Sequence, residues 1–228
     1  MDQLLQSIDV ARARRELDER GCFLIENVFS EDFCRSAMAF IDENEKDTST
    51  EVNYGGTEIR VWDSQKKNAL LGEFFERSQD VLKELFSETP KPQTLLAIRN
   101  LPTGDEARLQ QGRWHIDSFF KQMKVFVFLT PTTDESGPFE FIPASHKTSF
   151  KIKMLFRGLY LRWRDLLGRT RTYQRIEDGH IERLGEAGYR PQPVLCKAGT
   201  VMIVNTSAIH RARPCLRGSR YALTSYFQ

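Results

Sequence analysis

His115-Ile116-Asp117 and the distant His210 are the residues whose types and spacing best suit a metal site. A histidine and an aspartate at positions i and i+2 lie on one face of an extended segment. If the fold brings His210 alongside them, two imidazoles and one carboxylate meet at one face of an ion. This set is typical of non-haem Fe(II) oxygenases, which keep the opposite coordination positions open. The pattern predicts His115, Asp117 and His210 as metal ligands that carry the catalysis.

Histidine is scarce in this chain, which narrows the choice of ligands: the other two are His146 and His180. His115 and His210 lie 95 positions apart, far more than the short ligand spacings of local zinc motifs. A histidine in an apolar strand is more often a buried structural residue than a ligand, and a bare His-x-Asp tripeptide also arises by chance. The location favours the metal, because the tripeptide begins the predicted β region and His210 lies near its end.

Arg220 follows His210 by ten residues and starts a predicted strand over 220–227. A turn over 214–219 would fold it back beside the metal, where a guanidinium can hold a carboxylate through two hydrogen bonds. A 2-oxoglutarate cosubstrate needs this arrangement, since one end chelates iron and the other carboxylate needs a cation. Three other arginines are candidates for binding this carboxylate: Arg211, Arg213 and Arg217. Arg217 is the strongest of the three. Ser207 is a further candidate for the cosubstrate, with plain turn structure as its alternative.

The elements that must position these residues change in character along the chain. Helical spacing of apolar residues predicts helices over 2–19, 31–44 and 64–87, with a strand over 22–28. From residue 93 short apolar runs alternate with turn residues, and the predicted strands are 93–99, 125–129, 139–142, 193–196, 200–204 and 220–227. Together they predict an α+β fold with a mainly β, jelly-roll core and the N-terminal helices packed on one sheet.

Residues 150–190 interrupt the strands and predict a helical insertion within a single domain that spans 1–228. The segment from Lys147 to Arg175 contains nine basic residues and only one acidic residue, Asp165. One interpretation is an amphipathic helix whose cationic face is solvated. The other is a lid that attracts an anionic small-molecule substrate. Contact with an anionic membrane surface and stacking on nucleobases are weaker alternatives.

Charge and cysteine usage exclude several classes of protein. A net charge of +2 is nearly balanced, so it predicts no nucleic-acid partner. The four cysteines form no Cys-x-x-Cys pair and fit reduced thiols, which predicts a cytoplasmic protein. The N-terminus becomes charged before an apolar stretch of signal-peptide length, and no run approaches the ~18 apolar residues of a membrane span.

Taken together, these segments resemble the phytanoyl-CoA dioxygenase family. The resemblance rests on His115-x-Asp117, the strand over 125–130, the run from Ser136 to Lys147, His210 and Arg220. It extends from about residue 21 to the C-terminus, without 150–190. The run Pro143-Ala144-Ser145-His146 departs from the usual Pro-Gly-Ser-His of the family by its alanine.

The resemblance implies a double-stranded β-helix that uses Fe(II), 2-oxoglutarate and O2. It implies His115, Asp117 and His210 as iron ligands, Arg220 as the cosubstrate anchor, and a structural role for His146. The implied reaction is hydroxylation of a C–H bond in a small or medium organic substrate. Desaturation, cyclisation or epimerisation at the same iron site, and a non-catalytic metal-binding module, are the alternatives. Because Asp117 is present, halogenation is disfavoured.

Overall fold

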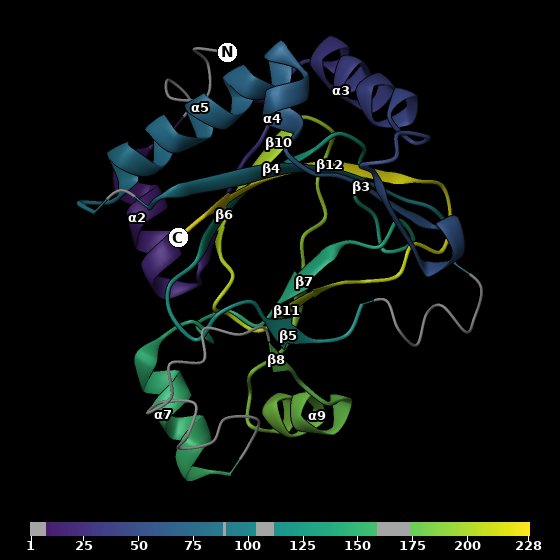
Figure 1. The fold of residues 1–228 in the computed structure, drawn as a ribbon. Helices are drawn as coiled ribbons and strands as arrows, with labels where there is room; N and C mark the ends of the chain where they lie inside the picture. Colours follow the sequence, from purple (N-terminus) through teal and green to yellow (C-terminus); the bar gives the residue numbers. More distant parts are fainter. Residues whose placement is uncertain (1–7, 89, 104–111, 159–173) are drawn as a thin grey trace.

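Two antiparallel sheets face each other in the computed structural model, which describes residues 8–88, 90–103, 112–158 and 174–228 (Figure 1). The larger sheet contains, in spatial order, β1 (Cys22–Ile25), β10 (Thr200–Asn205), β6 (Met123–Phe128), β12 (Arg220–Phe227), β4 (Pro92–Asn100), β3 (Glu58–Val61) and β2 (Glu51–Asn53). The smaller sheet contains β8 (Gln174–Arg175), β5 (His115–Ile116), β11 (His210–Ala212), β7 (Phe139–Phe141) and β9 (Gln192–Pro193). This arrangement confirms the predicted α+β class with a jelly-roll core.

The N-terminal helices cover the outer face of the larger sheet, as predicted (Figure 1). They are α2 (Val10–Glu19), α3 (Glu31–Glu43), α4 (Ser64–Lys67) and α5 (Ala69–Leu85). Ser30 caps α3 by accepting a hydrogen bond from the backbone N–H of Phe33. The single helix predicted over 64–87 is instead broken at Asn68, which is extended and caps α5 through its side chain. The break follows from this cap, because an N-cap residue leaves helical geometry.

Side chains on the strands of the larger sheet alternate between two environments. On β6, Val125 and Val127 pack into the core beneath the helices, whereas Phe126 and Phe128 pack between the sheets. Lys124 shares the second face, because it lies two residues from Phe126. The hairpin of β2 and β3 was not predicted, and it extends this sheet beyond β4. The 3-10 helix η1 (Tyr54–Gly56) connects the two strands.

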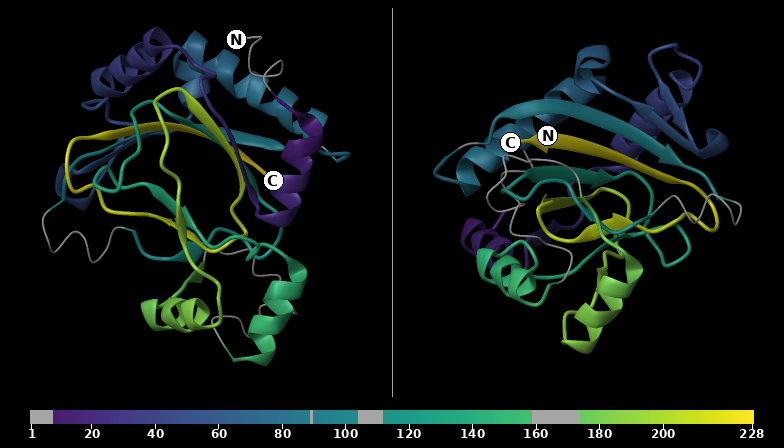
Figure 2. Two further views of the ribbon diagram at one scale, coloured as in Figure 1. Left: turned by 180° about the vertical axis from the view of Figure 1, so that it is seen from behind. Right: turned by 60° about the horizontal axis from the view of Figure 1, so that its bottom comes forward.

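Helices α7 (Thr148–Phe156) and α9 (Asp178–Glu186) pack against the outer face of the smaller sheet (Figures 1 and 2). Trp114, Ile116 and Ile209 contribute the sheet side of this core. The helices contribute residues such as Met154 and Leu184. The predicted insertion over 150–190 thus begins at residue 148 and also contains a short strand, β8, that pairs with β5. Residues 159–173, with most of the predicted basic run, lie outside the described residues.

No helix in the described ranges is both long and apolar enough to cross a membrane.

All four cysteines are free thiols, and three of them are buried. The fold is therefore held by packing and hydrogen bonds within the part of the chain that the structure describes.

Candidate metal centre

Strand β11 lies between β5 and β7 and brings the two distant histidines together. His210 pairs with His115 on one side and with Phe141 on the other. The backbone N–H of Asp117 donates to the carbonyl oxygen of Thr206 at 3.1 Å, which fixes the segment after β5. As a result, one ligand atom from each of His115, Asp117 and His210 lies within 4.8 Å of the others.

The carboxylate of Asp117 lies between the two imidazoles. Its Oδ1 is 3.7 Å from Nε2 of His115, and its Oδ2 is 3.6 Å from Nε2 of His210. Both distances are shorter than twice a typical metal–nitrogen distance of about 2.1 Å, so one ion can contact all three groups. Phe139 stacks on the His210 ring with the centroids 5.3 Å apart, which supports that ring from the smaller sheet.

Backbone carbonyl groups fix the tautomer of both histidines. Nδ1 of His115 lies 2.8 Å from the carbonyl oxygen of Arg113, and Nδ1 of His210 lies 2.9 Å from that of Ala208. A carbonyl oxygen only accepts hydrogen bonds, so each Nδ1 must carry the proton. The lone pair of each ring is therefore on Nε2, the atom that faces Asp117. The tautomers match the requirement for metal ligation.

The protonation states also suit a divalent cation. Burial lowers the pKa of His210 to about 3, and burial likewise lowers the pKa of His115, so both rings are neutral at neutral pH. Burial alone would raise the pKa of Asp117, but the positive charge of Lys124, and the charge that the two imidazoles carry at low pH, outweigh it and hold this pKa well below its usual range. The site offers two neutral nitrogen donors and one carboxylate.

A cavity of about 300 Å³ opens at this cluster. His115 and Asp117 line it, and so does Arg220 from the neighbouring sheet. Arg220 is buried, and its Nη2 donates to Oδ1 of Asn100 at 2.8 Å. Asn100 in turn donates to Glu58 at 2.9 Å. Burial lowers the pKa of Arg220, although a guanidinium stays charged at neutral pH. A fixed cation thus lines the same cavity as two of the three clustered residues.

Of the other candidates for the cosubstrate, only Arg213 is among the described residues that line this cavity. The Arg217 side chain is 80% exposed and pairs with Glu135 at 3.6 Å, outside the set of cavity-lining residues. Ser207 is buried, and its backbone N–H donates to the side chain of Asn205 at 3.1 Å. Arg211 and Arg213 bind the carboxylate of Glu140, although Arg213 also reaches the cavity wall. Of the candidate arginines, Arg220 combines burial with a place in this cavity.

The remaining histidines take no part in the cluster. Nε2 of His146 lies 3.1 Å from the carbonyl oxygen of Asp18, and its ring covers Gly21. A Cβ atom at Gly21 would lie 2.6 Å from Nδ1 of His146, so this contact requires glycine. His180 lies on α9 and is half-buried. The structural role expected for His146 agrees with these contacts.

Sequence reasoning missed Lys124 and Arg175, which both line the cavity. Lys124 interrupts the apolar run Met123–Phe128, and that interruption was the available signal. Arg175 pairs with His115 across β8 and β5. Its charge contributes to the lowered pKa of His115. A two-residue strand leaves no periodicity in a sequence, so this pairing had no signal.

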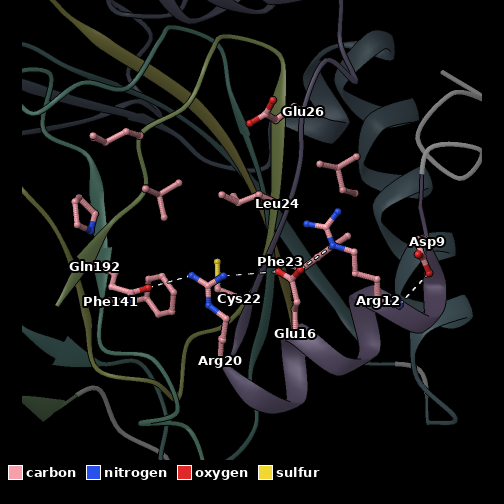
Figure 3. A pocket seen from close by; sticks show the side chains of 14 residues that line it. Asp9, Arg12, Glu16, Arg20, Cys22, Phe23, Leu24, Glu26, Phe141 and Gln192 are labelled. Atoms are coloured by element: carbon pink, nitrogen blue, oxygen red, sulfur yellow. Dashed lines mark hydrogen bonds and ion pairs between the residues drawn. The ribbon is translucent and has the colours of Figure 1, made fainter. Parts of the chain in front are cut away.

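A second, larger cavity of about 540 Å³ lies between α2, β1 and β9 (Figure 3). It contains none of the three clustered residues. Arg12 donates to Glu16 at 2.8 Å, and Arg20 donates to Gln192 at 3.0 Å (Figure 3). These cations are occupied by neighbours on the rim, so this cavity lacks the donor set of the smaller one.

The family model for phytanoyl-CoA dioxygenase matches residues 17–219, most of the chain. The chain belongs to the phytanoyl-CoA dioxygenase family. Its membership confirms the resemblance seen in the sequence and the expectation of a non-haem iron dioxygenase that uses Fe(II), 2-oxoglutarate and O2. No curated relative matches this chain.

Solved structures share the fold of this phytanoyl-CoA dioxygenase family member at low sequence identity. The carbocyclase SnoK from nogalamycin biosynthesis is 16% identical with a TM-score of 0.69, over 95% of this chain and 82% of its own. The epimerase SnoN, in complex with Fe3+, alpha ketoglutarate and nogalamycin RO, is 14% identical with a TM-score of 0.67, over 96% and 83%. HygX from Streptomyces hygroscopicus, with nickel, 2-oxoglutarate and hygromycin B bound, is 16% identical with a TM-score of 0.64, over 99% and 86%.

Proposed function

We propose that this protein hydroxylates a C–H bond of a small or medium organic substrate, with Fe(II) held by His115, Asp117 and His210. The observation that carries the proposal is the convergence of two Nε2 lone pairs and one ionised carboxylate within 4.8 Å. Three ligands on one face of an ion leave positions for a cosubstrate and O2. When bound, iron with 2-oxoglutarate supplies the oxidising power that no amino-acid side chain has.

Arg220 is the proposed anchor for the distant carboxylate of 2-oxoglutarate. It lines the cavity with His115 and Asp117, and its hydrogen bond to Asn100 orients the guanidinium. A buried guanidinium binds a carboxylate through two charge-assisted hydrogen bonds. Ser207 remains a weaker candidate for cosubstrate contact, because it lies outside the lining of this cavity. Arg217, the strongest competitor for this role, is exposed and does not line the cavity.

The charge of the cavity favours an anionic substrate. Its lining includes six cationic side chains and two acidic ones: Arg60, Arg113, Lys124, Arg175, Arg213, Arg220, Glu58 and Asp117. Glu140 and Asp134 offset the charge of Arg213 from outside the lining. Divalent iron and dianionic 2-oxoglutarate cancel each other, so among the described lining residues the cationic side chains still outnumber the acidic ones. Arg113 and Arg175 flank His115 and are the proposed contacts for a carboxylate or phosphate of the substrate.

The structural neighbours include a carbocyclase and an epimerase, so the same iron site supports other outcomes on this fold. Hydroxylation adds one oxygen atom to the substrate, whereas cyclisation removes two hydrogens and epimerisation leaves the mass unchanged. Mass spectrometry of the product therefore separates these reactions.

The test begins with anaerobic mixing of the protein, Fe(II) and 2-oxoglutarate. We expect a visible metal-to-ligand charge-transfer band, absent in His210→Ala. A screen of anionic and matched neutral metabolites for 2-oxoglutarate turnover then identifies the substrate class. A protein that binds iron but gives neither the band nor succinate with any substrate is a metal-binding module, and the proposal fails.

A further inference from the structure

We propose that Lys124 is a positioning residue that fixes the Asp117 carboxylate, so that Asp117 binds the metal through one oxygen. The inference rests on the function proposed above and concerns a residue from the opposite sheet. Nζ of Lys124 lies 2.7 Å from Oδ2 of Asp117. It also lies 4.2 Å from the centroid of the Tyr226 ring, whose face favours a cation.

Lys124 reaches this point because of the alternation of β6. Its neighbours on the same face, Phe126 and Phe128, fill the space between the sheets with apolar rings. A lysine at this depth destabilises the fold through lost hydration unless it is paired. The Lys124 side chain is only 8% exposed, so this cost applies to it. The Asp117 carboxylate and the face of the Tyr226 ring lie beside the ammonium and offset this cost.

The geometry restricts what Asp117 can do. A carboxylate has two oxygens, and a metal can take one or both of them. Oδ2 forms the ion pair with the ammonium, whereas Oδ1, 3.7 Å from Nε2 of His115, has no ammonium beside it. Asp117 would therefore bind the ion through Oδ1 and occupy one coordination position. Two histidines and a one-oxygen carboxylate leave three positions of an octahedron, which is the number that 2-oxoglutarate and O2 require. A carboxylate bound through both oxygens would remove one of them.

The alternative is that Lys124 only stabilises the fold, or repels the metal as a nearby positive charge. A repelling charge and an orienting group predict opposite changes in metal affinity when Lys124 is removed. Removing a repelling charge tightens binding of a divalent cation. Removing a group that orients a ligand weakens it, typically by about 10- to 100-fold.

Anaerobic titration with Co(II), an optical probe for Fe(II), tests the inference without turnover. We expect Lys124→Met to weaken Co(II) binding about 10- to 100-fold. Lys124→Gln keeps a hydrogen-bond donor without the charge and should recover most of the affinity. Lys124→Met with affinity equal to or tighter than the wild type would overturn the inference. Lys121→Met is the matched control, because Lys121 lies over the Phe86 ring at 3.5 Å, outside the metal cavity.

Infrared difference spectra of the wild type give a second readout that needs no folded Lys124 variant. A carboxylate bound through one oxygen shows a wider separation of its two stretching bands than one bound through both. We expect the wide separation on metal addition, and Asp117→Asn identifies the band. A narrow separation would also reject the inference. If the wild type binds no Co(II) at all, the proposed function fails instead, so the two failures are distinguishable.

Discussion

The two faces of β5 and β11 serve opposite purposes, although each strand has only two or three residues. One face carries His115 and His210, and it opens to a polar cavity. The other carries Ile116, and it is extended by Trp114 and Ile209, which directly precede the two strands; all three are buried in the core beneath α7 and α9. Because side chains alternate along a strand, each ligand is next to a residue that fixes the strand from behind. The comparison teaches that the covered face holds the ligands in place.

Loss of a ligand should break the functional face with the largest effect. We expect His210→Ala to reduce succinate formation on the order of 1,000-fold or more, since the metal contributes several kcal/mol to catalysis. The apoprotein should keep its fold, because Ile209 and the covered face are unchanged. Circular dichroism and a succinate assay measure the two properties separately. Full activity in this variant would refute the ligand assignment.

Damage to the covered face should act on stability instead. Leu184 on α9 is fully buried in this core and lies outside the metal cluster. Leu184→Ala should lower the free energy of unfolding by about 2–5 kcal/mol through the cavity that it leaves. Activity per folded molecule should stay at the wild-type level below the melting temperature. Denaturant titration and kcat at low temperature test both statements, and an unchanged unfolding energy would contradict the first.

A buried lysine on the covered side of the smaller sheet should make the stability of the protein depend on pH. Nζ of Lys151 on α7 donates to the carbonyl oxygen of Phe119 at 2.6 Å, and burial lowers its pKa from 10.5 to about 8. Between pH 8 and 10.5 the unfolded chain binds more protons at this group than the folded protein, so its contribution to stability rises with pH. Over this pH range the contribution of Lys151 to the free energy of unfolding changes by up to about 3 kcal/mol.

Lys151→Met should remove this contribution. Relative to the wild type, the variant should gain stability at pH 7, and the gain should shrink between pH 8 and 10.5. Urea denaturation at several pH values measures the difference. A gain that does not change with pH would assign the effect to packing alone.

The smallest expected effect concerns cosubstrate binding. Arg220→Ala should raise the KM for 2-oxoglutarate roughly 10- to 100-fold, the value of a charge-assisted contact. Arg217→Ala is the matched control, because Arg217 is exposed and pairs with Glu135. An unchanged KM in Arg220→Ala, or an equal rise in Arg217→Ala, would move the anchor elsewhere.

The sequence predicted those parts of the site that depend on alternation within a strand. His115 and Asp117 were predicted to share one face of an extended segment, because they are two residues apart. Lys124 was not predicted, because its contact with Asp117 joins the two sheets and has no sequence spacing. The same holds for Arg175, whose strand has two residues. The helix break at Asn68 was missed because capping competes with an unbroken apolar period.

The short pairing of β5 with β11 has a thermodynamic consequence. A single residue pair, His115 with His210, aligns these strands. An ion held by side chains from both strands would act as a cross-link at the place where a single residue pair joins the strands. Loading with metal should therefore raise the melting temperature, by the equivalent of about 2.7 kcal/mol at a free metal concentration 100 times Kd. Cells with little available iron would then hold less of this protein in its folded form.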